Sequence, residues 1–335
     1  MTDRIDEPYA GLTPDAMLDA IESVGLRCDG RQLTLNSYEN RVYQVGLEDA
    51  PPVIAKFYRA LRWSDAQILE EHSFANELAQ AEIPVVAPLS IGGKTLHHHG
   101  LFRFAVFPRR GGRTPELENM ETLAWLGRFL GRIHLIGAVR PFEHRPTLDA
   151  TTFGTDSRDW LLAHDVIPVE LRSAWQGAAE MALAQVAHCH ERAGIVRQIR
   201  LHGDCHPGNV LWIEDGVDRG PHFVDLDDAR SGPAVQDLWM LLPGDREAAQ
   251  RALGALIKGY EDFCEFDDRE LHLIEALRTL RLMHHSAWIA RRWADPAFPA
   301  AFPWFASPRY WQDRILELKE QSALMQEPPL RPLSI

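Results

Sequence analysis

The spacing of hydrophobic residues divides the chain into a first part with strand-like alternation and a second part with helical periodicity. Between residues 30 and 57, apolar side chains recur at every second position in three short runs, which is typical of β-strands. A short helix is predicted before them, with Thr13 as its N-cap and Pro14 at its first position. A longer helix is predicted after them, beginning near Ser64.

Two further strands are expected at residues 95–96 and 101–107, joined by a solvated turn of histidines at His97–Gly100. Antiparallel strands with one inserted helix predict a small α+β lobe. The composition then changes at Pro108–Arg113, which we interpret as a hinge.

Beyond this hinge the pattern is mostly helical, and we expect an N-terminal lobe of residues 1–108 and a C-terminal lobe of residues 109–335. One hairpin interrupts the helices, formed by apolar runs at residues 210–213 and 222–224. The predicted helices cover residues 120–138, 168–193, 245–263, 267–293 and 308–325.

The loop before this hairpin carries the residue types that phosphoryl transfer requires. Asp204 precedes Asn209 by the spacing found in kinase catalytic loops. Asp204 is predicted to accept the proton of the acceptor hydroxyl, and Asn209 to offer its amide oxygen to Mg²⁺. After the hairpin, Asp225 ends an apolar run and is predicted to hold the metal ion against the ATP phosphates. The sequence leaves open whether Asp227 or Asp228 shares that metal. An ATP- and Mg²⁺-dependent phosphotransferase is the prediction.

The cation that such a reaction needs is predicted to be Lys56, which lies in an apolar strand of a chain with few lysines. The alternative is a lysine that extends from an edge strand to solvent. Glu70, Glu71 and Glu77 are candidate partners on the following helix. Glu71 is favoured because it lies thirteen residues before Pro84, a spacing found in phosphotransferases with a similar Ile-Pro-Val segment.

The segment Ser37–Tyr43 occupies the place of a glycine-rich loop but contains no glycine. Phosphate binding there would use the Ser37 hydroxyl and backbone N–H groups. The alternative is an ordinary turn with Asn36 and Ser37 as turn residues.

Other polar residues near the loop have simpler interpretations. His202, Asp204 and His206 would suit a metal-dependent hydrolase, but that hypothesis leaves Asn209 without a role. Cys205 lies beside the proposed base and is not expected to be catalytic. Asp237 is predicted to brace the backbone of the catalytic loop.

The net charge of −13 argues against non-specific binding to nucleic acid or to an anionic membrane, since no basic run exceeds Arg109–Arg110. No apolar run is long enough to cross a bilayer, and residues 1–8 lack the apolar core of a signal peptide. Four scattered cysteines indicate free thiols. We therefore expect a cytoplasmic protein.

Five segments resemble the aminoglycoside phosphotransferase and choline kinase-like superfamily, and within it the bacterial serine/threonine protein kinases of the stress response. The resemblance implies a bilobal protein-kinase-like fold of the α+β class and a monomer that phosphorylates serine and threonine of proteins. The kinase itself is a candidate acceptor. It also implies that Ser37 contacts ATP. The segments are Asn36–Tyr43, Leu69–Phe74, Phe104–Pro108, Leu201–Trp212 and Phe223–Trp239.

Two rival functions stay open. Asp225 and Asp237 are too close in sequence for a long activation segment, so a kinase acting on a small sugar, amino alcohol or antibiotic is one alternative. The other is an inactive pseudokinase, against which the presence of Lys56, Asp204 and Asn209 argues.

Overall fold

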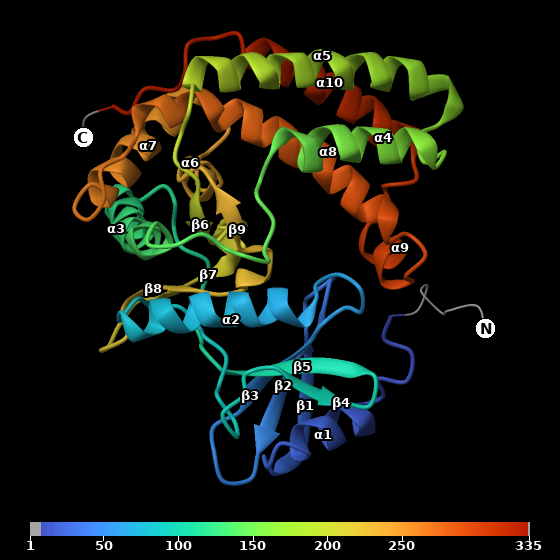
Figure 1. Cartoon of the computed structure of the whole chain (residues 1–335), viewed down its shortest axis with the longest axis vertical. Coiled ribbons are helices and arrows are strands. Elements are labelled where there is room, and N and C mark those ends of the chain that lie inside the picture. The colour runs from blue at the N-terminus through green and yellow to red at the C-terminus, as the bar shows by residue number, and fades with distance from the viewer. Residues whose placement is uncertain (1–7, 334–335) are drawn as a thin grey trace. The chain divides into compact units, whose positions relative to one another are not determined.

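A computed structural model describes residues 8–333 and groups them into two compact units (Figure 1). Residues 1–7, on which the expected absence of a signal peptide mainly rests, lie outside this range. The first unit comprises the residues up to Pro115, Phe142–Arg145 and Pro207–Ala229. The second unit comprises Glu116–Pro141, Pro146–His206 and the residues from Arg230 onward.

The first unit contains a five-stranded antiparallel sheet with the strand order β1-β2-β3-β5-β4 (Figure 1). Its strands are β1 (Cys28–Leu35), β2 (Arg41–Leu47), β3 (Val53–Phe57), β4 (His97–His99) and β5 (Phe102–Pro108). Because β3 lies at the centre of this order, Lys56 is flanked by Val42 on β2 and Ala105 on β5. The predicted α+β class is confirmed.

Two helices accompany the sheet and begin where their caps predict. The hydroxyl of Thr13 accepts a hydrogen bond from the Ala16 N–H at 3.2 Å at the start of α1 (Pro14–Glu22). Ser64 and Gln67 form a capping box at the start of α2 (Asp65–Gln80). Met17 and Ile21 of α1 are fully buried in the core of the sheet, which orients this helix.

The prediction of a solvated histidine turn was wrong, because the three histidines form strand β4. His97 is buried, and its ring lies 5.4 Å from the ring of Phe104, its partner on β5. His98 lies on the opposite face, where its Nε2 is 3.0 Å from Asp65. Alternation along the strand therefore separates neighbouring histidines, and Gly100, with φ 56°, supplies the turn instead.

The predicted hairpin is present as β7 (Val210–Ile213) and β8 (Gly220–Phe223), and both strands belong to the first unit. Backbone bridges join Trp212 to Arg113 and Phe223 to Val85. The hairpin thus carries the ends of two loops, the 3₁₀ helix η2 (Pro207–Asn209) before it and the segment from Val224 after it.

The second unit is mainly helical. Its α-helices are α3 (Met120–Gly137), α4 (Asp156–Ala163), α5 (Val169–Ala193), α6 (Val235–Trp239), α7 (Arg246–Tyr260), α8 (Ile274–Arg291), α9 (Ala297–Ala301) and α10 (Pro308–Leu324). Helices α5 and α10 pack alongside each other (Figure 1). Helices α3 and α7 approach closely at Gly127, which has no side chain. A Cβ atom at this position would collide with the carbonyl oxygen of Leu256.

The prediction of one long helix over residues 267–293 was wrong for its first residues. Asp267 accepts a hydrogen bond from the Arg269 N–H at 3.1 Å and begins a 3₁₀ helix, η4 (Asp268–Leu273), and α8 follows it. Strand β6 (Ile199–Leu201), directly before the predicted catalytic loop, pairs with β9 (Arg230–Gly232) in a two-stranded sheet. Among residues 8–333, no helix combines the length and the apolar character needed to cross a bilayer.

Candidate active site

Lys56 is buried in the first unit and faces two carboxylates. Its Nζ lies 2.7 Å from Oδ1 of Asp225 and 3.4 Å from Oδ1 of Asp227. Burial alone would lower the pKa of Lys56, but Asp225, Asp227 and the nearby Glu71 outweigh burial and raise the pKa well above its usual value. Lys56 is therefore a fixed positive charge and not a lysine that extends to solvent.

Asp225 follows β8 and has the backbone conformation of a functional loop. Its φ of 60° and ψ of 63° place a non-glycine residue in the left-handed region, which costs about 1–3 kcal/mol and is concentrated at active sites. Its side chain is 52% exposed, so one carboxylate binds Lys56 and still reaches solvent. The Val224 N–H donates to the carbonyl oxygen of Asn209 at 3.0 Å, and both predicted metal ligands thus flank the same end of the hairpin.

Asp227 is the centre of a charged cluster that sequence reasoning did not identify. Its carboxylate is ion-paired with Arg62 and Lys56, and it accepts a hydrogen bond from Asn40 Nδ2 at 3.1 Å. Burial would raise the pKa of Asp227, but Arg62 and Lys56 outweigh burial and lower the pKa. Asp227 is therefore a buried anion held between two cations.

Arg62 and Asn40 tie this cluster to the sheet. Arg62 also binds both carboxylate oxygens of Asp228 at 2.9 Å, and Asn40 Oδ1 accepts from the Arg59 N–H at 3.1 Å. Asn40 lies within the segment that replaces the glycine-rich loop, so the sequence contained a signal for it. Arg62 lies in no recognisable motif.

Glu71 is buried on α2 and affects Lys56 electrostatically, although Lys56 forms its ion pairs with Asp225 and Asp227. Burial raises the pKa of Glu71 to about 7, and its Oε2 lies 3.9 Å from Nη1 of Arg145. The pairing of Glu71 with Lys56 stays a prediction.

Two other predicted residues of this region have different surroundings. Glu70 accepts hydrogen bonds from the N–H groups of Glu143, His144 and Arg145, so it holds the 142–145 segment. Ser37 is half-buried in the connection between β1 and β2, and its proposed contact with ATP stays a prediction.

Asp204 belongs to the second unit, where it forms an ion pair with α8. Its Oδ1 accepts a hydrogen bond from Arg281 Nη1 at 2.6 Å, and Nε2 of His206 lies 3.6 Å from its Oδ2. The side chain of Asp204 is 22% exposed and that of Arg281 is 37% exposed. A partly accessible carboxylate can accept a proton from a bound hydroxyl.

Asp237 braces the catalytic loop, as the sequence predicted. Its two carboxylate oxygens accept hydrogen bonds from the N–H groups of His202 at 2.8 Å and Gly203 at 2.9 Å. His134 Nε2 lies 3.1 Å from the same carboxylate, and His134 Nδ1 lies 3.0 Å from the hydroxyl of Tyr260. Burial would raise the pKa of Asp237, but the hydrogen bonds and positive charge around it lower the pKa. The backbone next to Asp204 is therefore held by a buried anion.

Cys205 fits its expected non-catalytic role. The side chain is fully buried, and burial raises the pKa of its thiol well above the usual value, so the reactive thiolate is suppressed.

The oxygen donors of Asn209 and Asp225 fit a magnesium ion. Mg²⁺ prefers hard oxygen ligands and is usually bound by one or two carboxylates together with substrate phosphates and water. Within the described part of the chain, no group of three or more His, Cys, Asp and Glu side chains is arranged to hold a metal by itself. A site completed by the phosphates of a nucleotide agrees with this donor set.

Comparison with known proteins also indicates a phosphotransferase. Residues 31–274 match the family described as "Phosphotransferase enzyme family". The chain is 47% identical to stress response kinase A of Escherichia coli K12 over 324 residues, which cover 96% of each protein. It is 44% identical over 323 residues, 96% of each protein, to the serine/threonine protein kinase RdoA of Salmonella typhimurium.

A solved structure of the amicoumacin kinase hAmiN, in complex with AMP-PNP, Ca²⁺ and Ami, is similar in fold. Its TM-score is 0.70 at 18% identity, and the match covers 94% of each chain. The fold, the family match and the extent of the relatives' alignment agree: the chain belongs to the phosphotransferase enzyme family, in the group of bacterial stress response kinases.

Proposed function

We propose that this protein transfers the γ-phosphoryl group of ATP to serine and threonine hydroxyls of proteins, in the bacterial response to stress. The ion pair between Lys56 and Asp225 is the observation that carries the proposal. It joins two residues 169 positions apart that the sequence had independently assigned to phosphate and metal binding. The names of the relatives that align over 96% of the chain support a protein acceptor.

In the proposed reaction, the acceptor hydroxyl oxygen forms a bond to the γ-phosphorus while the bond to the β–γ bridging oxygen breaks. Asp204 orients the hydroxyl and takes its proton, which it later releases to solvent. The electron pair of the broken bond leaves on ADP. Lys56 binds the nucleotide phosphates, and Ser37 with the backbone around it covers them.

Asn209 and Asp225 are the residues that would hold Mg²⁺, and Glu71 would help to orient Lys56. The bound metal would neutralise charge on the phosphates and so stabilise the transition state. Adenine would lie against the segment around Phe107–Pro108. We place the protein in the cytoplasm as a monomer.

The rival proposal is a kinase of the same fold that acts on a small molecule. Only η3 (Leu226–Asp228), β9 and the start of α6 lie between Asp225 and Asp237, and this short connection favours the rival over a kinase with a long activation segment.

A transfer assay with γ-labelled ATP distinguishes these functions. Wild-type protein and Asp204→Ala are incubated with Mg²⁺ and either a bacterial protein extract or a panel of amino alcohols, sugars and aminoglycosides. We expect label on protein serine and threonine, including the kinase itself, and a loss of about 10²–10⁴ in rate for Asp204→Ala.

Label on small alcohols alone would replace the main proposal with the rival. Mg²⁺-dependent ATP binding without transfer to any acceptor would indicate a pseudokinase, and near-normal turnover of Asp204→Ala would remove Asp204 from its role.

A further inference from the structure

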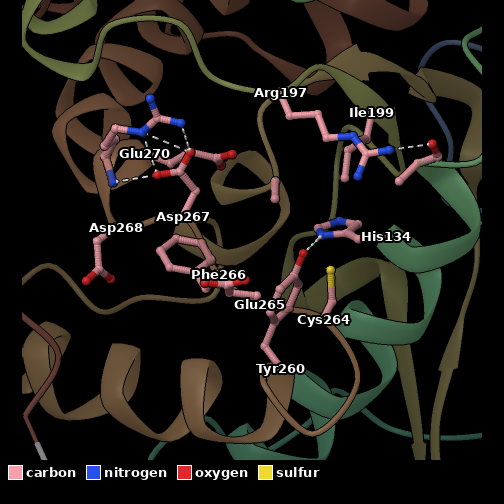
Figure 2. A pocket seen from close by; sticks show the side chains of 13 residues that line it. His134, Arg197, Ile199, Tyr260, Cys264, Glu265, Phe266, Asp267, Asp268 and Glu270 are labelled. Carbon is pink, nitrogen blue, oxygen red and sulfur yellow. Dashed lines mark hydrogen bonds and ion pairs between the residues drawn. The ribbon is translucent and has the colours of Figure 1, made fainter.

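A cavity of about 540 Å³ lies in the second unit, apart from the residues assigned to phosphoryl transfer (Figure 2). Its volume falls within the range of roughly 300–1,000 Å³ that is usual for small-molecule sites. Apolar surface comes from Ile199 and Phe266, and the rings of Phe266 and Tyr260 meet edge to face at 5.9 Å. Most of the remaining lining is charged.

The charge of the lining is negative overall. The basic residues among the lining are Arg197 and Arg269, against four acidic ones, which are Glu265, Asp267, Asp268 and Glu270. Arg269 is already paired with Asp267 at 2.7 Å. Two exposed carboxylates at Glu265 and Asp268 therefore remain, together with the buried Glu270.

Glu270 is the informative member of this group because it is only 3% exposed. Its Oε2 accepts a hydrogen bond from the Val235 N–H at 2.8 Å. Within residues 8–333, no basic side chain lies at ion-pair distance from it. Burial raises the pKa of Glu270 to about 7, although the Val235 N–H and the charge of Arg269 act to lower it. A cationic group bound in the cavity would give Glu270 an ion-pair partner.

Two hydrogen-bonded routes connect the cavity to the catalytic loop. In the first, the hydroxyl of Tyr260 is hydrogen-bonded to His134, and both residues lie in the cavity wall (Figure 2). His134 in turn is hydrogen-bonded to the carboxylate of Asp237. In the second, Glu270 binds the Val235 N–H at the start of α6, the helix that carries Asp237. Asp237 in turn holds the backbone of His202 and Gly203, directly before Asp204.

We propose that this cavity is a regulatory site for an aliphatic polyamine, whose binding stabilises the catalytic loop through Tyr260, His134 and Asp237. One ammonium group pairs with Glu270, and another pairs with the exposed carboxylates at the mouth. The methylene chain between them lies against Phe266 and Ile199. The binding site stands on its own, whereas the effect on turnover rests on the proposed kinase function.

Calorimetric titration of the full chain with spermidine, at constant ionic strength, tests the binding site. Wild-type protein should show one saturable site. Glu270→Gln keeps an oxygen that accepts from Val235 but loses the charge, so affinity should fall roughly tenfold or more. Asp268→Asn, an exposed change that leaves the fold intact, should weaken binding about twofold.

Glu320→Gln is the matched control, because it removes one charge from the exposed face of α10, outside the cavity lining. Its affinity should equal that of the wild type. Absence of saturable binding would overturn the site, and so would an equal loss in Glu270→Gln and Glu320→Gln, which would indicate only general attraction to an acidic protein.

Amide hydrogen exchange of the peptide that contains His202 and Gly203 tests the coupling without any need for activity. Spermidine should slow this exchange in the wild type. Tyr260→Phe keeps the aromatic wall and removes the hydroxyl, so this positioning residue should affect binding less than twofold while reducing the slowing, because the route from Glu270 through Val235 is left intact.

Unchanged exchange in spermidine-saturated wild type would overturn the coupling. If spermidine binds and slows exchange while no acceptor is ever phosphorylated, the regulatory site stands and the proposed function fails. If transfer occurs but spermidine alters neither the hydrogen exchange nor the rate of transfer, the proposed kinase function stands and the regulatory role of the cavity fails.

Discussion

The two units carry charged active-site residues in different ways. In the first unit, Asp227 forms side-chain ion pairs with Lys56 and Arg62. Lys56 and Asp227 are buried, and the side chain of Arg62 is 10% exposed. In the second unit, the buried carboxylate of Asp237 accepts hydrogen bonds from backbone N–H groups, those of His202 and Gly203 just before Asp204. Asp204 itself forms an ion pair at a partly exposed position.

This difference predicts that stability and activity respond separately to mutation. A buried ion pair that loses one partner leaves an uncompensated charge, whereas a partly exposed pair is screened by water. Substitutions in the first unit should therefore mainly lower the stability of the protein, and substitution of Asp204, the proposed base in the second unit, should mainly lower its activity.

The largest expected effect is on turnover in Asp204→Asn. The amide keeps the shape of the side chain but accepts no proton, so kcat should fall about 10²–10⁴-fold, equivalent to about 3–5 kcal/mol of transition-state stabilisation. The melting temperature should stay within about 2 °C of the wild type, because the lost pair with Arg281 is partly exposed. Steady-state kinetics and calorimetry measure the two quantities.

Asp262→Asn is the matched control, since it removes a surface pair with Arg128 in the same unit. This variant should change neither kcat nor the melting temperature. A large loss of stability in Asp204→Asn would show that the second unit depends on side-chain pairing as the first does, and the comparison would fail.

In the first unit, Asp227→Asn should give the largest loss of stability. It leaves Lys56 and Arg62 buried with less compensating charge, so the free energy of unfolding should fall by about 3–5 kcal/mol. Denaturant unfolding measures the change. Asp218→Asn removes an exposed pair with Arg110 in the same unit and should cost less than about 1 kcal/mol. Equal effects of the two variants would contradict the distinction between buried and exposed pairs.

Asp237→Asn should have a smaller effect with a distinct pH dependence. Its amide NH₂ would face a backbone N–H, and one unpaired buried donor costs about 1–3 kcal/mol. The folded-state pKa of Asp237 is lowered, so its contribution to stability is present above the usual value of 3.8 and is lost as pH falls further. Unfolding measured between about pH 3 and pH 7 should therefore show less acid destabilisation in the variant than in the wild type. Parallel curves for the two proteins would refute this.

The residues that could be predicted from the sequence lie in local motifs. Asp204 and Asn209 share one loop, Asp225 ends an apolar run, and Asp237 follows at short spacing. The predicted bracing of the loop by Asp237 is confirmed by its hydrogen bonds to the backbone. This contact could be predicted because it depends only on the structure close to the loop.

The partners that escaped prediction are distant in sequence. Arg62 and Asn40 contact Asp227 across 165 and 187 residues, and no local pattern encodes such pairings. Strand β4 was not predicted for another reason. Histidine is polar, so three in a row suggested an exposed turn, whereas His97 packs against the aromatic ring of Phe104. The start of η4 likewise depends on the hydrogen bond from Asp267 rather than on periodicity.

The smallest expected effect is at the start of α2, where local sequence sufficed. Ser64→Ala removes the oxygen that accepts from the Gln67 N–H at 3.2 Å, and N-cap losses cost about 1 kcal/mol. Glu70 and Glu71 lie on this helix, yet both are placed by tertiary contacts further along, so kcat should be unchanged. Ser64→Asp, which restores an accepting oxygen, should recover the lost stability in denaturant unfolding. A loss of turnover in Ser64→Ala without any change in stability would mean that the charged cluster depends on this terminus more than its ion pairs indicate.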